Sequence, residues 1–335
     1  MKLLAGVDIG GTKCAVSLGN AVDGGVELRA KRKFPTPSAP EETIRCLSGA
    51  LDELLAEQSS AASLAGIGIS CGGPLDSRRG VVLSPPNLPG WQEVDVVTPF
   101  RKRYGVPAAL QNDANACALA EWQWGAGQGL DNMIFLTFGT GMGAGLIFDG
   151  RLYSGANDMA GEIGHVRVAE QGPGGYGKTG SFEGFCSGGG MAHLAQLEAL
   201  KRLQRGERPP LCSSLDRLAS LDARTVGEAA RHGDELALAV MRQTGEMLGA
   251  GLALLVDLLN PQLIVIGSIY GRQQTLLEPY ALAKLKAEAH PRSWAACRIV
   301  PAFFGEQIGD YASLSVAQYT SAGKPLTASF ACPIR

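Results

Sequence analysis

The sequence lacks a strong charge of either sign. It contains 30 lysine and arginine residues against 32 aspartate and glutamate residues, which gives a formal net charge of -2. Proteins that bind nucleic acids or anionic membranes usually carry extended basic surfaces. The composition therefore gives no indication of a nucleic acid or a membrane as a partner, and we expect neither.

Long uninterrupted apolar runs are also missing. The longest apolar region, residues 248–267, is interrupted by Asp257, Asn260 and Pro261. This pattern predicts a buried helix, a turn and a buried strand instead of a membrane span. The apolar stretch at the N-terminus is too short for a secretory signal, so we expect a cytoplasmic protein.

Paired cysteines, which mark many redox and metal sites, are absent. No two of the eight cysteines form a C-x-x-C pair, and they are scattered along the chain. In a chain of this length without a secretory signal, such cysteines are expected to stay reduced and to pack as small apolar side chains. They are Cys14, Cys46, Cys71, Cys117, Cys186, Cys212, Cys297 and Cys332.

Glycine, in contrast, is abundant, with 45 glycines in 335 residues, nearly twice its usual frequency. Because glycine permits backbone conformations that other residues avoid, this predicts tight turns or close approach of the backbone to ligands. A chain of this length also exceeds what one hydrophobic core usually serves. We therefore expect two domains.

Strands and helices alternate along the sequence. Apolar runs that end in glycine, such as residues 3–10 and 64–73, alternate with helical segments such as residues 39–58. This alternation predicts an α/β fold with mainly buried sheets. Residues 5–18 and 134–147 align without gaps as strand, glycine turn and strand. We interpret the pair as an internal duplication; the alternative is that so common a hairpin occurs twice by chance.

One segment matches the sequence pattern of the phosphate-binding P-loop, G-x-x-x-x-G-K-[ST]. The matching residues are Gly172, Gly177, Lys178 and Thr179. A working P-loop follows a buried strand and begins a helix. Here the preceding segment is short and half polar, and the glycine-rich residues 180–190 are poor material for a helix. We therefore interpret the match as accidental and expect Lys178 to be dispensable for nucleotide binding.

Two glycine turns are better candidates for phosphate binding. Each offers consecutive backbone N–H groups and a threonine hydroxyl, a combination that binds anions without a helix. Asp8, at the end of the strand before the first turn, is placed to bind Mg²⁺ directly or through water. For either turn alone, the alternative is a tight hairpin without a ligand. The candidate phosphate-binding residues are Gly10, Gly11, Thr12 and Lys13 in the first turn and Thr140 and Gly141 in the second.

Six segments together resemble the ROK family (repressor, open reading frame, kinase) in order and spacing. They are VDIGGTK at residues 7–13, GISCGGPLD at 68–76, PNLPGW at 86–91, QNDANACALAE at 111–121, FGTGMGAGLI at 138–147 and AGEIGHVRV at 160–168. The resemblance covers nearly the whole chain. It implies an α/β, actin-like (ribonuclease H-like) ATPase fold with two duplicated α/β domains around a central cleft. The implied domains are a smaller N-terminal one, residues 1–118 plus about 306–335, and a larger C-terminal one, residues 119–305.

The resemblance also implies an activity. ROK enzymes are ATP- and Mg²⁺-dependent kinases of hexoses and N-acetylhexosamines, so we expect phosphorylation of a hexose, first of all at the 6-hydroxyl of glucose or a similar sugar. N-acetylhexosamine kinases and fructokinases of the same family are alternatives, and the phosphate donor could be another nucleotide or polyphosphate. The family also contains sugar-responsive repressors, so a non-catalytic regulator is the alternative from a different class. That role would need a helix-turn-helix, for which we expect no room before Asp8. A homodimer is expected from the family.

Individual residues match the family's functional positions. Asp113 matches the catalytic base, which accepts the proton of the sugar hydroxyl as the phosphoryl group transfers. From the residue alone, the alternative is a helix N-cap after the strand at residues 108–111. Gly267 matches the position where the family places adenosine. The sugar-contacting positions correspond to Gly72, Gly73, Asn87, Asn112, Asp113, Glu162, His165 and Glu183.

The sequence departs from the family at a zinc-binding loop. Many members bind a structural zinc ion through the GEIGH histidine and three cysteines, and those cysteine positions hold Gly174, Tyr176 and Ser181 here. Glycine has no donor atom, and tyrosine and serine are poor zinc ligands beside thiolate. We therefore predict that the chain binds no structural zinc and that packing, for example by Tyr176 and Phe182, orders the loop.

Overall fold

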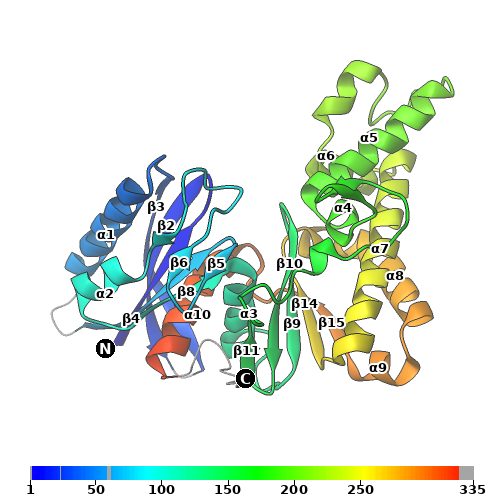
Figure 1. The fold of residues 1–335 in the computed structure, drawn as a ribbon. Helices are drawn as coiled ribbons and strands as arrows, with labels where there is room; N and C mark the ends of the chain where they lie inside the picture. The colour runs from blue at the N-terminus through cyan, green and yellow to red at the C-terminus, as the bar shows by residue number, and fades with distance from the viewer. Residues whose placement is uncertain (1, 23, 59–61, 324–335) are drawn as a thin grey trace, which may run out of the picture. The chain divides into compact units, whose positions relative to one another are not determined.

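The computed structural model describes residues 2–22, 24–58 and 62–323 (Figure 1). Cys332 and the end of the predicted first-domain segment 306–335 lie outside the described residues. The chain divides into two compact units: the first comprises Met1–Phe135, Gly145–Gly161 and Ala302–Arg335, and the second comprises Leu136–Ala144 and Glu162–Pro301. These bounds define compact units and do not test the predicted domain boundaries near residues 118 and 306, which stay a prediction.

The first unit is built on a five-stranded sheet with the order β3-β2-β1-β4-β8. In it, β1 pairs antiparallel with β2 and β2 with β3, whereas β1 pairs parallel with β4 and β4 with β8. Most residues of β1, β4 and β8 are buried because both faces of the sheet are covered. The strands are β1 (Lys2–Ile9), β2 (Lys13–Val22), β3 (Gly25–Pro35), β4 (Ser63–Cys71) and β8 (Ala108–Asn112).

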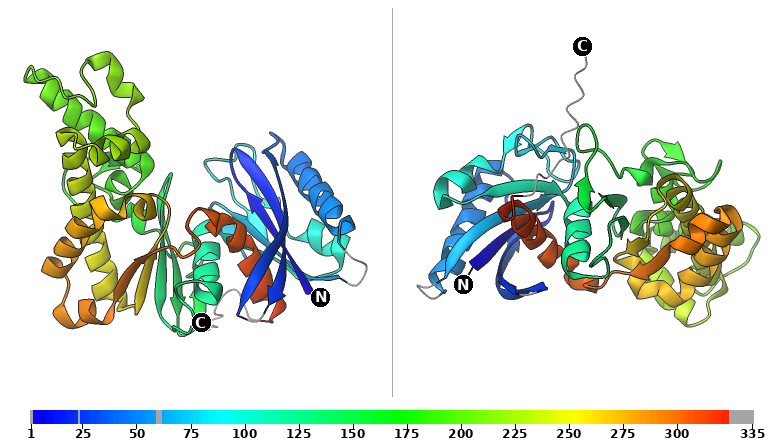
Figure 2. Two further views of the ribbon diagram at one scale, coloured as in Figure 1. Left: turned by 180° about the vertical axis from the view of Figure 1, so that it is seen from behind. Right: turned by 90° about the horizontal axis from the view of Figure 1, so that it is seen from below.

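Helices cover both faces of this sheet. Side chains alternate along a strand, so β1 packs Ala5 and Val7 in the cluster that includes the helix α1 residues Leu47 and Leu51, and packs Leu4 beside α10. Helix α10 lies beside β1, β4 and α3, although it is the last described helix of the chain (Figure 2). The helices of this unit are α1 (Pro40–Ala56), α2 (Thr98–Tyr104), α3 (Asp113–Trp124) and α10 (Ile308–Ser321), with a short η3 (Gly305–Gln307).

A second five-stranded sheet repeats this topology. Its order is β11-β10-β9-β14-β15, so in both sheets the third strand in chain order lies at one edge, followed by the second, the first, the fourth and the fifth. Strands β10 and β11 are antiparallel, and β14 and β15 are parallel. The repeated order confirms the predicted internal duplication. The strands are β9 (Met133–Phe138), β10 (Met142–Phe148), β11 (Arg151–Tyr153), β14 (Leu263–Ile266) and β15 (Arg298–Pro301).

The second unit is dominated by helices. The long α7 packs closely along α8 because Gly245 and Gly249 bring the two backbones together; a Cβ atom at Gly245 would lie 2.8 Å from the Leu277 carbonyl oxygen. In the described residues, no helix combines the length and the hydrophobicity that crossing a membrane requires. The helices are α4 (Phe182–Phe185), α5 (Gly188–Gln204), α6 (Ala223–Arg231), α7 (Glu235–Leu259), α8 (Ile269–Glu288) and α9 (Pro291–Ala296), with η1 (Ile163–His165) and η2 (Leu215–Ser220).

Two small sheets complete the described structure. One has the order β5-β6-β7 and the other pairs β12 with β13. The first follows the end of β4, and the second lies in the segment that matches the P-loop sequence pattern. Their strands are β5 (Leu75–Asp76), β6 (Val81–Val82), β7 (Val94–Asp95), β12 (Gly174–Gly175) and β13 (Lys178–Thr179).

Candidate active site

Three neighbouring strand ends bring together the predicted residues of the first unit. β1, β4 and β8 are parallel, and their register pairs Ile9 with Cys71 and Cys71 with Asn112. The residues that follow these strands, Gly10, Gly72 and Asp113, therefore emerge at one edge of the sheet. In α/β proteins this carboxyl edge is where ligands usually bind.

Asn112 and Asp113 stand at the junction of β8 and α3. The Ala114 backbone N–H donates to Asn112 Oδ1 at 2.9 Å and to Asp113 Oδ1 at 2.8 Å. Asn112 is the N-cap, and Asp113 is the first residue of the helix. The alternative that Asp113 is the N-cap is therefore wrong, because its neighbour holds that position.

The Asp113 carboxylate is reachable by solvent and is more basic than usual. The residue is exposed, yet the protein atoms around its carboxyl group raise its pKa by desolvation, against the opposing effect of the Ala114 N–H. Gly73 lies next to the neighbouring residue Asn112: a Cβ atom at Gly73 would be 3.2 Å from Asn112 Nδ2. Asp113, Asn112 and Gly73 thus form one cluster.

The first glycine turn joins β1 to β2 and is held from two sides. The Thr36 hydroxyl donates to the Gly10 carbonyl oxygen at 2.6 Å, and the Thr36 backbone N–H donates to the Thr12 carbonyl oxygen at 3.1 Å. On another side, a Cβ atom at Gly11 would lie 2.8 Å from the Asn87 Cβ atom. The structure thus places the predicted sugar contact Asn87 against the predicted phosphate turn, while Thr12 and Lys13 are exposed.

Asp8 is a half-buried carboxylate with two other carboxylates in its surroundings. Its pKa is raised to about 7, first by burial and then by the carboxylates of Asp113 and Asp310, while Lys31 and Lys33 act in the opposite direction. A cation would relieve this repulsion, and Mg²⁺ is commonly bound by one or two carboxylates together with water and substrate phosphates. Asp8 therefore fits Mg²⁺. Within the described residues there is no complete ligand set of three or more acidic, histidine or cysteine side chains.

The second glycine turn, residues 139–141, joins β9 to β10 and connects two parts of the second unit. The Gly188 N–H donates to the Gly139 carbonyl oxygen at 2.8 Å. At the other end of the turn, the Met142 N–H donates to Glu183 Oε2 at 2.9 Å, and a Cβ atom at Gly141 would lie 2.8 Å from the same oxygen. The turn thus binds the start of α5 on one side and Glu183 on the other.

The predicted sugar residues of the second unit lie together beside this turn. A Cβ atom at Gly164 would be 3.3 Å from the Glu183 Cβ atom, so the GEIGH segment packs against Glu183. Within that segment, His165 Nε2 lies 3.8 Å from Glu162 Oε2, and both side chains are exposed. Glu162, His165 and Glu183 therefore form a second cluster.

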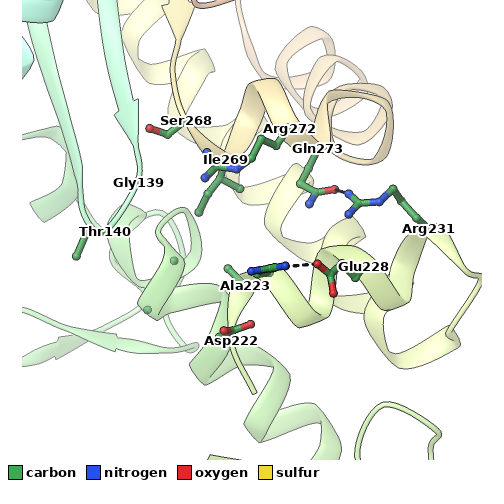
Figure 3. Close-up of a pocket in the computed structure, with 13 residues that line it drawn as sticks. Gly139, Thr140, Asp222, Ala223, Glu228, Arg231, Ser268, Ile269, Arg272 and Gln273 are labelled. Atoms are coloured by element: carbon green, nitrogen blue, oxygen red, sulfur yellow. Dashed lines mark hydrogen bonds and ion pairs between the residues drawn. The ribbon is translucent and has the colours of Figure 1, made fainter. Parts of the chain in front are cut away.

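A pocket of about 960 Å³ opens on the other side of the turn. Figure 3 shows Gly139 and Thr140 facing Glu228 and Arg231 across it. The predicted residue Gly267 lies just behind the wall, because its N–H donates to the Leu136 carbonyl oxygen at 2.9 Å and the next residue lines the pocket. The lining residues are Gly139, Thr140, Gly188, Gly189, Asp222, Ala223, Arg224, Glu228, Arg231, Ser268, Ile269, Arg272 and Gln273.

Sequence reasoning missed the helical wall of this pocket. Arg224 Nε donates to Glu228 Oε1 at 2.8 Å, and Arg231 Nη1 donates to Gln273 Oε1 at 2.7 Å. Three arginines against two acidic residues give the lining a small positive excess, which suits a phosphorylated ligand. The usable signal was the spacing of Arg224, Glu228 and Arg231, which places them on one face of α6.

The segment that matches the P-loop sequence pattern forms a β-hairpin. β12 and β13 pair antiparallel, and Tyr176 and Gly177 at the turn have φ values of 53° and 71°, as in a type I′ turn. Lys178 and Thr179 therefore lie in a strand and do not begin a helix. This geometry agrees with the interpretation of the match as accidental.

The residues at the three cysteine positions of the zinc loop do not fit a zinc ion. Gly174 offers no side chain, and the Ser181 hydroxyl accepts the Gly184 N–H at 3.1 Å as the N-cap of α4. Tyr176 lies flat on the histidine that would complete the site, His165, with 3.4 Å between the ring centroids. A tetrahedral site needs four ligands, normally thiolate or imidazole, and one imidazole does not supply them.

Comparison with known proteins agrees with these features. The sequence model of the ROK family matches residues 4–317. The chain is 32% identical over 282 residues to a glucokinase of Thermotoga maritima, covering 82% of this chain and 84% of the relative. It is 34% identical over 295 residues to an N-acetylmannosamine kinase of Shigella flexneri, covering 87% and 91%.

Solved structures share the fold. A ROK family glucokinase from Streptomyces griseus, in complex with glucose and AMPPNP, superposes with a TM-score of 0.72 at 30% identity, covering 94% of this chain and 99% of that one. A ROK family transcriptional regulator, a homologue of the Escherichia coli MLC protein, superposes with a TM-score of 0.81 at 25% identity, covering 96% and 79%. The predicted α/β, actin-like fold is confirmed, and the chain belongs to the ROK family.

Proposed function

We propose that this chain is an ATP- and Mg²⁺-dependent sugar kinase that transfers the γ-phosphate of ATP to a hexose hydroxyl, with the 6-hydroxyl of glucose or a similar hexose as the first expectation. The observation that carries the proposal is the position of Asp113. It is an exposed carboxylate at the carboxyl edge of the first sheet, with Asn112 and Gly73 beside it and the capping role already taken. The glucokinase relatives support the choice of sugar.

Asp113 acts as the general base in this proposal. A sugar hydroxyl is a weak nucleophile, so a positioned carboxylate accepts its proton as the phosphoryl group transfers. The raised pKa of Asp113 makes its carboxylate a stronger base than a fully solvated one. Because the ionised form is the base, turnover falls as the pH is lowered through that raised pKa.

The two glycine turns hold the phosphates. Residues 10–13 and 139–141 present backbone N–H groups, and Thr12, Lys13 and Thr140 add two hydroxyls and a cation. Phosphoryl transfer depends mainly on positioning and charge neutralisation. Mg²⁺, when bound with the help of Asp8, supplies part of that neutralisation. The pocket next to Thr140 and Gly267 takes the nucleoside.

Sugar hydroxyls are read by groups that donate or accept in fixed directions. The proposal assigns this task to the backbone of Gly72 and Gly73, to Asn87, Asn112 and Asp113, and to Glu162, His165 and Glu183. The N-acetylmannosamine kinase relative makes an N-acetylhexosamine the second candidate substrate. A cytoplasmic location and a homodimer belong to the same proposal; light scattering tests the homodimer.

The test is ADP release over a panel of hexoses and N-acetylhexosamines, with ATP and polyphosphate as parallel donors. Asp113→Asn should lose nearly all turnover yet still bind the sugar in calorimetry. Asp149→Asn is the matched control, because this exposed turn residue has a φ of 49° that asparagine tolerates. Wild-type rates in Asp113→Asn would refute the role of the base. Sugar binding without turnover in the wild type would favour a regulator.

A further inference from the structure

Tyr176 connects the two predicted sugar residues His165 and Glu183. Its hydroxyl donates to Glu183 Oε2 at 2.6 Å. Its ring stacks on the His165 ring, with 3.4 Å between the centroids and 23° between the planes. The side chain remains 47% exposed, so burial in a hydrophobic core does not explain its position. Its contacts are made with residues of the candidate sugar site.

Glu183 is held from two directions through one oxygen. Its Oε2 accepts the Met142 N–H at 2.9 Å and the Tyr176 O–H at 2.6 Å. The first bond ties the carboxylate to the second glycine turn, and the second ties it to the hairpin. Burial and the bond to Glu183 raise the pKa of Tyr176, so the phenol stays protonated and can donate at any physiological pH.

The backbone of Tyr176 is in a conformation that its residue type disfavours. Its φ is 53°, in the left-handed region where a non-glycine residue other than asparagine or aspartate costs on the order of 1 kcal/mol. Gly177 follows it in the same region. A glycine at residue 176 would form this turn with less strain. The geometry of the turn therefore does not account for a tyrosine at this position.

We propose that Tyr176 is a positioning residue that orders the candidate sugar site without a metal, by fixing the Glu183 carboxylate with its hydroxyl and the His165 ring with its own ring. In metal-binding members of the family, the resemblance assigns the ordering of this loop to zinc. Here one side chain, at a position that matches a zinc-binding cysteine of the family, links the hairpin to His165. The inference rests on the proposed function, which assigns Glu183 and His165 to the sugar.

Two substitutions separate the two contacts. Tyr176→Phe keeps the ring on His165 and removes the hydroxyl, whereas Tyr176→Gly removes both contacts and relieves the backbone. Tyr280→Phe is the matched control, an exposed tyrosine on α8 of the same unit. Kinetics should be measured with sugar and ATP varied separately, together with sugar affinity by calorimetry without ATP and the melting temperature.

We expect Tyr176→Phe to raise the KM for the sugar about tenfold, because a hydrogen bond to a charged group is lost, and to leave kcat and the KM for ATP nearly unchanged. Tyr176→Gly should raise the sugar KM further without lowering the melting temperature. A fall in melting temperature with kcat and both KM values changed together would overturn the inference, since it would mean that Tyr176 only keeps the loop folded. Unchanged sugar KM in both variants would overturn it as well.

The metal is tested separately from activity. Elemental analysis of the purified protein should find no stoichiometric zinc, and a chelator should leave the melting temperature unchanged. One zinc ion per chain that is lost in His165→Ala would overturn the inference while leaving the kinase proposal intact. Absence of both turnover and sugar binding in the wild type would instead refute the proposed function, and this inference with it.

Discussion

Asn87 lies directly against Gly11 in the first glycine turn. A Cβ atom at residue 11 would be 2.8 Å from the Asn87 Cβ atom and would overlap the Asn87 carbonyl oxygen. The contact ties a residue assigned to the sugar to a turn assigned to phosphate. Even the smallest side chain at residue 11 must therefore displace the turn, Asn87 or both.

We predict that Gly11→Ala lowers kcat/KM about 100-fold or more, the effect that a displacement of about 1 Å at reacting groups can have. Both the KM for the sugar and the KM for ATP should rise, because the displacement affects the sugar contact Asn87 and the phosphate turn together. Gly49→Ala, in α1, is the control and should keep wild-type kinetics, because a Cβ atom there would meet nothing within 4 Å. A Gly11→Ala enzyme with wild-type kcat/KM would show that the turn can move without cost.

The raised pKa of Asp8 predicts a pH-dependent stability of the metal-free protein. In the unfolded chain the carboxyl group titrates near 3.8, and in the folded protein near 7. Between these values the folded state binds more protons, so the free energy of unfolding falls as the pH rises from about 4 to about 7. Asp8→Asn should remove this loss and be the more stable protein at pH 8, by more than about 1 kcal/mol.

Urea unfolding at pH 5 and pH 8, with a chelator present, measures this effect. The stability difference between wild type and Asp8→Asn should be smaller at pH 5 than at pH 8. The same difference at both values would mean that desolvation and the neighbouring carboxylates of Asp113 and Asp310 do not act on Asp8 as described.

The pocket beside the second glycine turn predicts an effect of charge on ATP. Gly189 lines the pocket, and a Cβ atom there would meet nothing within 4 Å. Gly189→Asp should raise the KM for ATP about tenfold by repulsion of phosphate, yet keep the fold, since an acidic residue in the first turn of α5 favours the helix. Gly189→Asn, with the same shape and no charge, is the control and should have a much smaller effect.

We expect no such effect from Lys178→Ala, in the segment that matches the P-loop sequence pattern. Because Lys178 lies in the β12–β13 hairpin, its removal should leave the KM for ATP unchanged. Loss of ATP affinity in Lys178→Ala, with normal affinity in Gly189→Asp, would return the nucleotide to the hairpin and contradict the assignment of the pocket.

The packing of α10 predicts a strong effect at Gly68. A Cβ atom there would overlap the Ser313 carbonyl oxygen and lie 2.8 Å from the Val316 Cβ atom. Gly68→Ala should therefore lower the free energy of unfolding by about 3 kcal/mol, at the upper end of typical overpacking. Gly309→Ala, on α10 with open space around it, should leave stability unchanged or raise it by up to about 1 kcal/mol. Chemical denaturation of both variants provides the comparison.

Several features could be predicted from the sequence because they depend on neighbours along the chain. The two hairpins, the junction of strand and helix at Asn112 and Asp113, and the implausibility of a P-loop at Lys178 are of this kind. Local backbone preference decides them: an apolar run ending in glycine stops a strand, and asparagine caps a helix. Local reasoning was wrong at residues 180–190, which were expected to be poor material for a helix, because α4 (Phe182–Phe185) forms there and α5 begins at Gly188.

Other features could not be predicted because they join residues far apart in the sequence. Asn87 against Gly11, and Arg231 with Gln273 in the pocket wall, come from different elements and form no motif. The same is true of the contacts that order the zinc-type loop, because its three cysteine positions are occupied by other residues. The sequence determined that Tyr176 stands where a zinc ligand would be. Only the tertiary structure decided that its ring meets His165 and its hydroxyl meets Glu183, because stacking and hydrogen bonding require distances and directions that the folded backbone sets.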